Sequence, residues 1–186
     1  MPRRKTLEFK TISIDGPLII QPKVFGDHRG YFFESYSNRD FDSAGLDLNF
    51  VQDNQSLSDK GVLRGMHFQK PPFEQGKLIR VIAGAVQDVI IDIRKTSPTY
   101  GQSYSIILSG ENKTMFWIPP GFAHGFCTLE DNTIFAYKCT ELYKPESEDG
   151  LIYNDAHFNI DWQMSDVKMS DKDLRFESFN NFQSPF

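Results

Sequence analysis

Short extended runs separated by turn residues constrain the fold of this 186-residue chain. The runs are rich in Val, Ile and aromatic residues, including many of the 17 Phe and 7 Tyr. Gly, Pro, Asn and Asp stand between them, which is typical of strands joined by tight turns. Roughly nine or ten strands at near-regular spacing predict an all-β, double-sheet jelly roll. An immunoglobulin-like sandwich is disfavoured because its Cys–Trp–Cys signature is missing.

The strongest strand predictions fall on either side of Gly84, which predicts a tight hairpin between them. One short helix is expected at 39–44, with Ser37 and Asn38 at its start and Gly45 at its end. Beyond residue 143 the chain becomes polar and loop-rich, and 165–186 fits either a short helix or a loosely packed terminus. The strands are expected at 18–20, 31–36, 50–56, 61–69, 77–82, 85–93, 102–108, 114–118, 125–129 and 133–140.

The bulk composition indicates one domain over 1–186, cytoplasmic and soluble, because no 18-residue apolar run and no signal peptide occur. The net charge is −5 and the Lys and Arg residues are scattered, so nucleic acid and membranes are not expected partners. The basic run at 2–5 is predicted to be a solvated terminus. Cys127 and Cys139 form no CxxC pair and are interpreted as small buried hydrophobes.

The stretch 61–69 places Arg64 and His67 three residues apart on a predicted strand. Strict alternation directs His67 inward, together with Gly65, and sends Arg64 to the opposite face. An inward histidine is either a core residue hydrogen-bonded to the backbone or a general base lining a pocket. If both side chains serve one site, the strand must twist or bulge, or Arg64 must reach around the rim.

Other polar residues stand where strand patterns favour apolar ones. Taken singly, each has an ordinary structural interpretation, but together they offer a base, an acid, a cation and an anion-binding arginine at a barrel mouth. A metal site is poorly supported, because the four histidines at 28, 67, 124 and 157 include no His-x-His pair. The residues concerned are Arg29, Lys77, His124, Tyr137 and Tyr143.

Several longer runs resemble the dTDP-4-dehydrorhamnose 3,5-epimerase family of cupin-like sugar-nucleotide epimerases. Their order and spacing match from about residue 18 to residue 173, so the resemblance covers most of the chain and is highly specific in combination. The runs are 25–34, 51–54, 61–69, 75–78, 89–101, 117–126, 137–138, 143–145 and 170–173.

The resemblance implies a double-stranded β-helix jelly roll and a cofactor-free isomerase. Its substrate would be a dTDP-linked 4-keto-6-deoxyhexose, inverted at C3 and C5 in deoxysugar synthesis for surface polysaccharide. Removing a proton α to a ketone requires a base and a stabilised enolate, and inversion requires a proton donor on the other face. By resemblance His67 is the base, Asp173 orients it, Lys77 stabilises the enolate, and Tyr137 and Tyr143 are candidate donors.

The resemblance also implies how the nucleotide sugar is bound. Arginine suits a diphosphate because its charged donors bind in a bidentate manner. Family members form homodimers that exchange N-terminal strands, so Arg29 and Glu34 would serve the neighbour's site. The binding positions are Arg29 and Arg64 for the diphosphate, Glu34, Gln52 and Asn54 for the nucleotide, His124 for the sugar, and Glu148 and Lys172 at the periphery.

The departures from the family pattern remove no catalytic group. Glu74 replaces a small residue before Gln75, Gln55 replaces a common His, and Met66 and Phe68 are mild substitutions. Glu74 is expected near the rim, where it would influence sugar choice, so substrate identity is less fixed than chemistry. Three alternatives stay open at this point: an epimerase that inverts C3 or C5 only, a non-catalytic sugar-nucleotide-binding cupin, and a metal-dependent cupin enzyme.

Overall fold

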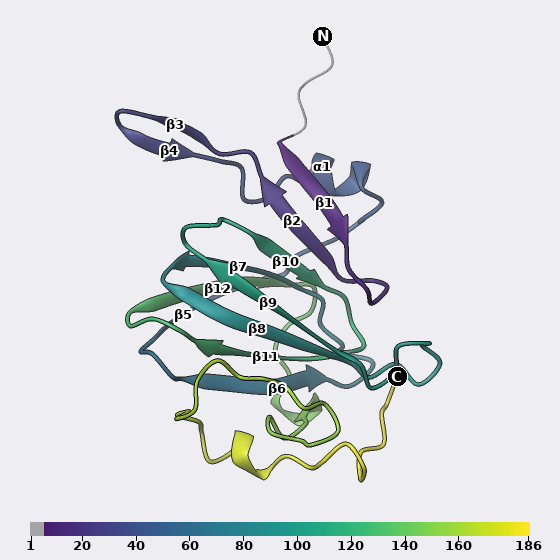
Figure 1. Ribbon diagram of the computed structural model, residues 1–186. Helices are drawn as coiled ribbons and strands as arrows, with labels where there is room; N and C mark the ends of the chain where they lie inside the picture. The colour runs from purple at the N-terminus through teal and green to yellow at the C-terminus, as the bar shows by residue number, and fades with distance from the viewer. Residues whose placement is uncertain (1–5) are drawn as a thin grey trace.

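The computed structural model describes residues 6–186, and two packed antiparallel sheets form its body (Figure 1). One sheet has the order β1 (Leu7–Thr11), β2 (Leu18–Pro22), β10 (Met115–Ile118), β7 (Lys77–Ala83), β12 (Thr133–Cys139) and β5 (Gln52–Ser58). The other has the order β13 (Glu148–Gly150), β6 (Leu63–Gln69), β11 (Phe122–Thr128), β8 (Ala85–Asp92) and β9 (Ser103–Ser109). The predicted double-sheet, mostly β architecture is confirmed.

Helices are few and short. The α-helix α1 (Asn38–Ser43) begins one residue before its predicted start, with Ser37 at the N-cap position and Gly45 in a left-handed conformation after its end. Two 3₁₀ turns, η1 (Pro145–Ser147) and η2 (Asp173–Arg175), occur in the C-terminal part. No helix between residues 6 and 186 has the length and apolar character needed to cross a membrane. The basic run at 2–5 lies outside the described residues.

The main core lies between the sheets, where strand alternation points apolar residues inward from both sides. Ile79 and Val81 of β7 pack there with Ile90 of β8 and with Phe116 and Phe135. The outer face of the five-stranded sheet is covered by the C-terminal segment, drawn in yellow in Figure 1. This covering explains why every residue of β8 is buried, since both of its faces are enclosed.

The predicted hairpin at Gly84 is wrong. Strand β7 pairs with β10 and β12, whereas β8 pairs with β9 and β11, so Gly84 is a corner at which the chain passes from one sheet to the other. Its φ of +75° suits a glycine, and a side chain there would overlap Thr133. A hairpin and a sheet-to-sheet corner place glycine between two apolar runs alike, so the pattern does not distinguish them.

Two strands of the sandwich were not predicted, and both are edge strands. Strand β1 pairs only with β2, and β13 pairs only with β6. The segment 31–36 also differs from its prediction, because extended pairing stops at Phe32. Strand β4 (Gly30–Phe32) instead forms a two-stranded hairpin with β3 (Phe25–Asp27), and this hairpin projects from the body at the upper left of Figure 1.

Candidate active site

A cavity of about 790 Å³ opens between the two sheets, with the C-terminal segment along one side. Most of the predicted site residues line it, although they come from strands of both sheets and from two loops. The sandwich therefore brings together side chains that are far apart in the sequence. Those that line the cavity are Gln52, Asn54, Arg64, His67, Lys77, His124, Tyr137, Tyr143, Glu148, Lys172 and Asp173.

A β-bulge in β6 places Arg64 and His67 on the same cavity. His124 of β11 pairs with His67 and Phe126 pairs with Arg64, so Gly65 and Met66 together oppose the single residue Gly125. An extra residue shifts the alternation by one position, which turns both side chains to one face. The strict alternation expected from the sequence is wrong here. The strand bulges, which is one of the conditions under which Arg64 and His67 were expected to serve the same site.

The space beside Gly65 is occupied by backbone. Gly65 has a φ of +138°, and a Cβ on it would lie 2.5 Å from the Cα of Gly125. The two glycines therefore allow β6 and β11 to approach closely. The room that a side chain at residue 65 would take is filled by the neighbouring strand, so it is not open to a ligand.

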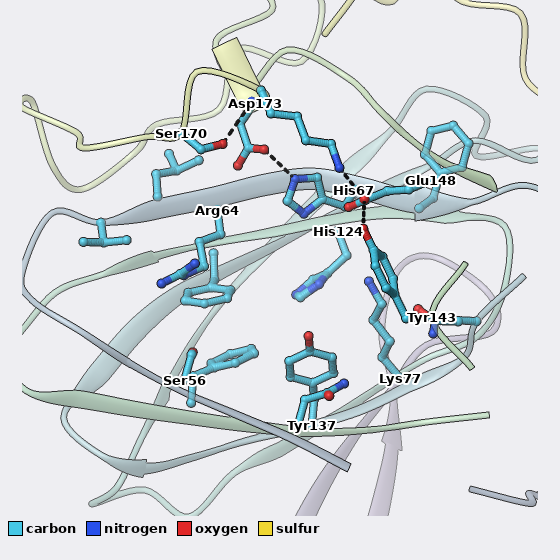
Figure 2. Close-up of a pocket in the computed structure, with 18 of the residues that line it drawn as sticks. Ser56, Arg64, His67, Lys77, His124, Tyr137, Tyr143, Glu148, Ser170 and Asp173 are labelled. Atoms are coloured by element: carbon cyan, nitrogen blue, oxygen red, sulfur yellow. Dashed lines mark hydrogen bonds and ion pairs between the residues drawn. The ribbon is translucent and has the colours of Figure 1, made fainter. Parts of the chain in front are cut away.

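His67 is held by a carboxylate from the far end of the chain. Its Nε2 lies 2.8 Å from Oδ1 of Asp173 (Figure 2). The Gly65 amide donates a hydrogen bond of 3.2 Å to Oδ2 of the same carboxylate. Burial opposes ionisation of Asp173, but the hydrogen bond and charge of His67, together with the contacts of the Gly65 amide and Ser170, outweigh it and lower the pKa of the carboxyl group. An ionised Asp173 fixes Nε2 as the protonated nitrogen and leaves Nδ1 of His67 free to accept a proton.

Tyr137 and Lys77 present free polar ends to the same cavity. Figure 2 shows the Tyr137 hydroxyl pointing from β12 toward His67 on the opposite sheet, with the Lys77 amine beside them. Neither group has a hydrogen-bond partner among residues 6–186. Burial raises the pKa of Tyr137 and lowers the pKa of Lys77. Both polar ends are thus available to a ligand.

Tyr143 is engaged differently from Tyr137. Its hydroxyl donates a hydrogen bond of 2.5 Å to Glu148, and this bond raises the pKa of Tyr143 to about 12. The same carboxylate oxygen of Glu148 also contacts Lys172, and the Tyr143 amide donates to Gln52. The four residues form one polar wall at the cavity entrance, in which the Tyr143 phenol already has a partner.

A second histidine–carboxylate pair lies deeper in the site. Nε2 of His124 is 2.9 Å from Oδ2 of Asp88, which has no exposed surface. The sequence interpretation identified His124 but missed Asp88. A carboxylate within the most apolar predicted strand was the available signal, since buried aspartates need a partner.

Known proteins resemble this chain over most of its length. The family model described as dTDP-4-dehydrorhamnose 3,5-epimerase matches residues 11–181. The chain belongs to this family. The dTDP-4-dehydrorhamnose 3,5-epimerase of Shigella flexneri is 50% identical over 87% of this chain and 90% of its own length. That of Methanothermobacter thermautotrophicus is 50% identical over 91% of this chain and 94% of its own.

Solved structures show the same similarity. The dTDP-6-deoxy-D-glucose-3,5-epimerase of Legionella pneumophila, solved in complex with dTDP-4-keto-L-rhamnose, is 48% identical and covers 95% of both chains with a TM-score of 0.91. The resemblance found in the sequence motifs is confirmed, and so is the cupin-like fold. The epimerase family is one of cofactor-independent isomerases. No cluster of three or more His, Cys, Asp or Glu side chains suited to a metal occurs within 6–186.

Two positions predicted to bind the epimerase substrate lie away from this cavity. Arg29 is on the turn of the β3–β4 hairpin, with a side chain 79% exposed and paired with Asp27. Glu34 follows the hairpin and accepts a hydrogen bond from Thr6. Neither residue lines the cavity.

The departures Gln55 and Glu74 from the epimerase pattern have different positions. Gln55 lines the cavity, whereas Glu74 does not. One oxygen of Glu74 is instead buried with no hydrogen-bond partner in the described part of the chain. Gln55 and the milder substitution Phe68 line the cavity, so a substrate can contact them, whereas the expected influence of Glu74 at the rim finds no support. Ser56 and Phe135 also line the cavity, and neither lies in a run that resembles the family.

Proposed function

We propose how this protein, an isomerase of the dTDP-4-dehydrorhamnose 3,5-epimerase type, divides its chemistry between the two sheets. His67 removes a proton α to the C4 ketone of a dTDP-4-keto-6-deoxyhexose, and Tyr137 returns one from the opposite face. The observation that supports this assignment is the opposition of His67 and Tyr137 across one cavity, with Lys77 beside them (Figure 2).

The base acts through Nδ1 of His67. Nε2 is occupied by Asp173, so Nδ1 is the nitrogen that carries a lone pair in the neutral ring. When Nδ1 takes the proton, the ring becomes an imidazolium and the carboxylate of Asp173 stabilises its charge. The proton at C3 and the proton at C5 are removed in turn, because both carbons flank the same ketone.

Lys77 stabilises the enolate that each removal creates. Its ammonium group has lost most of its hydration, which is why its pKa is lowered. Negative charge that develops on O4 replaces the lost water as the partner of the ammonium, and this interaction is stronger in a site shielded from solvent. Lys77 therefore favours the enolate over the ketone.

Tyr137 supplies the proton on the other face. Its burial keeps the phenol protonated, and its hydroxyl has no competing partner among residues 6–186. Tyr143 is less suited to this step because its hydroxyl already donates a hydrogen bond to Glu148. We therefore assign Tyr137 as the main proton donor and assign Tyr143 to substrate binding in the polar wall at the cavity entrance.

Deuterium incorporation tests these roles. With the keto sugar in deuterated water, the wild-type protein should invert and label both C3 and C5. His67→Ala should label neither carbon, whereas Tyr137→Phe should still exchange protons at His67 but fail to invert. Tyr143→Phe is the matched control and should retain inversion. Full turnover by His67→Ala, or labelling of only one carbon by the wild type, would contradict the proposal.

We further propose that the protein is a homodimer in which the β3–β4 hairpin carries Arg29 and Glu34 to the partner's cavity. The hairpin projects from the body, and its Tyr31 and Phe32 are 60% and 65% exposed. Apolar side chains of this size are normally covered by a partner when they cluster. In this arrangement Arg29 supplies its positive charge to the diphosphate bound in the partner's cavity, rather than to one bound in its own chain.

Complementation tests the exchange. Arg29→Ala and His67→Ala homodimers should each have little activity, but a mixed dimer contains one intact site, formed by His67 of one chain and Arg29 of the other. Equal amounts of the two variants are unfolded and refolded together, which makes half of the dimers mixed. Because each mixed dimer has one intact site of two, about a quarter of wild-type activity should return. No recovery, with mixed dimers verified by mass, would show that Arg29 acts within its own chain.

A further inference from the structure

The deeper histidine–carboxylate pair differs from the His67 pair in how its carboxylate is satisfied. Asp173 accepts hydrogen bonds from both His67 and the Gly65 amide. Asp88 receives only the one from His124, and its Oδ1 is buried without a hydrogen-bond partner among residues 6–186. Every hydrogen bond to the Asp88 carboxylate thus depends on a proton at Nε2 of His124.

This dependence selects one tautomer of His124. If the proton moved to Nδ1, the lone pair of Nε2 would face the Asp88 carboxylate, which would then be buried with no donor at all. Burial raises the pKa of Asp88, but the charge and hydrogen bond of His124 and the charge of nearby Lys77 act against this shift and favour the carboxylate. Burial lowers the pKa of His124 against the opposing charge of Asp88, and the charges of Lys77 and of His67 on the neighbouring strand lower it further. With the ring neutral and the carboxylate ionised, the hydrogen-bond geometry assigns the ring hydrogen to Nε2.

The other nitrogen of His124 faces the ligand space. His124 is 7% exposed and lines the cavity. Its Nδ1 has no hydrogen-bond partner within 6–186. Unlike Glu74 Oε2 and Asp88 Oδ1, which also lack a partner, this nitrogen is not fully enclosed by protein. Nδ1 therefore offers a lone pair to whatever occupies the cavity.

We propose that Asp88 is a positioning residue that makes His124 an obligate hydrogen-bond acceptor for a hydroxyl of the sugar ring. This inference rests on the proposed function. A 4-keto-6-deoxyhexose linked through O1 has hydroxyl donors only at C2 and C3, because C4 is a ketone and C6 is a methyl group. His124 consequently holds the C2–C3 edge of the ring, while Lys77 takes the ketone oxygen beside it.

The tautomer can be measured in the unmodified protein. The wild-type protein is labelled with ¹⁵N at histidine for NMR, and the His124 signals are assigned by their loss in His124→Gln. At pH 7, Nε2 of His124 should show the chemical shift of a protonated nitrogen and Nδ1 that of an unprotonated one. Protonation at Nδ1 would overturn the inference. This result does not depend on turnover, so it is separate from failure of the proposed function, which would appear as no deuterium incorporation by the wild type.

Asp88→Asn tests the consequence for binding. The amide of asparagine donates to Nε2 and so drives the proton to Nδ1, which then faces the sugar hydroxyl as a second donor. Affinity for dTDP-L-rhamnose should fall about tenfold or more, as expected for a lost hydrogen bond between buried groups, whereas affinity for dTDP should stay within about twofold.

The matched control is Asp92→Asn, which alters another fully buried aspartate of β8 that is bonded to Arg94 outside the cavity. It should leave both affinities and the His124 signals unchanged. If Asp88→Asn weakened dTDP and dTDP-L-rhamnose equally, or neither, the positioning role would be refuted.

Discussion

Replacing Gly65 by alanine tests whether the close approach of β6 and β11 sets the geometry of the base. The new Cβ would lie 2.5 Å from the Cα of Gly125 and 3.0 Å from the carbonyl oxygen of His124. Ordinary contacts begin at 3.4 Å, so the strands must separate by nearly 1 Å. His67 is only two residues away on the same strand and should move with it.

The free energy of unfolding should fall by about 4 kcal/mol. A left-handed backbone at a residue with a side chain accounts for about 2 kcal/mol, and the forced separation for a similar amount. For a chain of this length the melting temperature should drop by about 12 °C. Displacing the base by nearly 1 Å should lower kcat about 100-fold.

Gly45→Ala is the matched control. Gly45 also has a positive φ, +80°, but no atom lies within 4 Å of the position that a Cβ would occupy, so only the backbone strain applies. This variant should lose about 1 kcal/mol and keep its kcat. Melting curves and turnover of the keto sugar measure both effects. A Gly65→Ala protein that matched Gly45→Ala in both would refute the idea that strand crowding at Gly65 positions His67.

Three further predictions follow from the polar contacts. Asp173→Asn should lower kcat about 1,000-fold with little change in melting temperature, because an amide donating to Nε2 of His67 leaves Nδ1 protonated; a near-normal kcat would contradict this. Tyr143→Phe should lower kcat less than about tenfold, as measured by the same turnover assay. Burial raises the pKa of Asp92, but bonds from Arg94 and two hydroxyls outweigh it and lower that pKa to about 2. Its carboxylate therefore stabilises the fold by about 2 kcal/mol above pH 4 and loses this contribution as pH falls toward 2, a dependence that urea titrations should find missing in Asp92→Asn.

The sequence was a good guide wherever a local pattern had one structural meaning. Apolar alternation located most strands to within a few residues, and Ser37 with Gly45 bounded the helix. Gly84 had two meanings, because a glycine between apolar runs fits a hairpin and a corner equally well. Its sheet assignment depended on partners that are remote in sequence, which periodicity does not reveal.

The same distinction applies to the site. His67, Lys77 and Tyr137 were identifiable as polar residues on apolar strands, and motif resemblance supplied Asp173. The shared face of Arg64 and His67 was not predictable from alternation, because a bulge is created by pairing with a neighbouring strand. Asp88 was missed for a related reason: its role exists only through the histidine that the fold places beside it.

The contact between His67 and Asp173 spans 106 residues of sequence and has a consequence for the protein during its synthesis. The chain emerges from its N-terminal side during synthesis, so the strands of both sheets, which end at Gly150, are available before Asp173. The base, however, lacks its carboxylate until the segment that contains Asp173 has emerged and docked beside β6. A nascent chain that has formed the strands of both sheets is therefore still unable to deprotonate a sugar efficiently until this segment is in place.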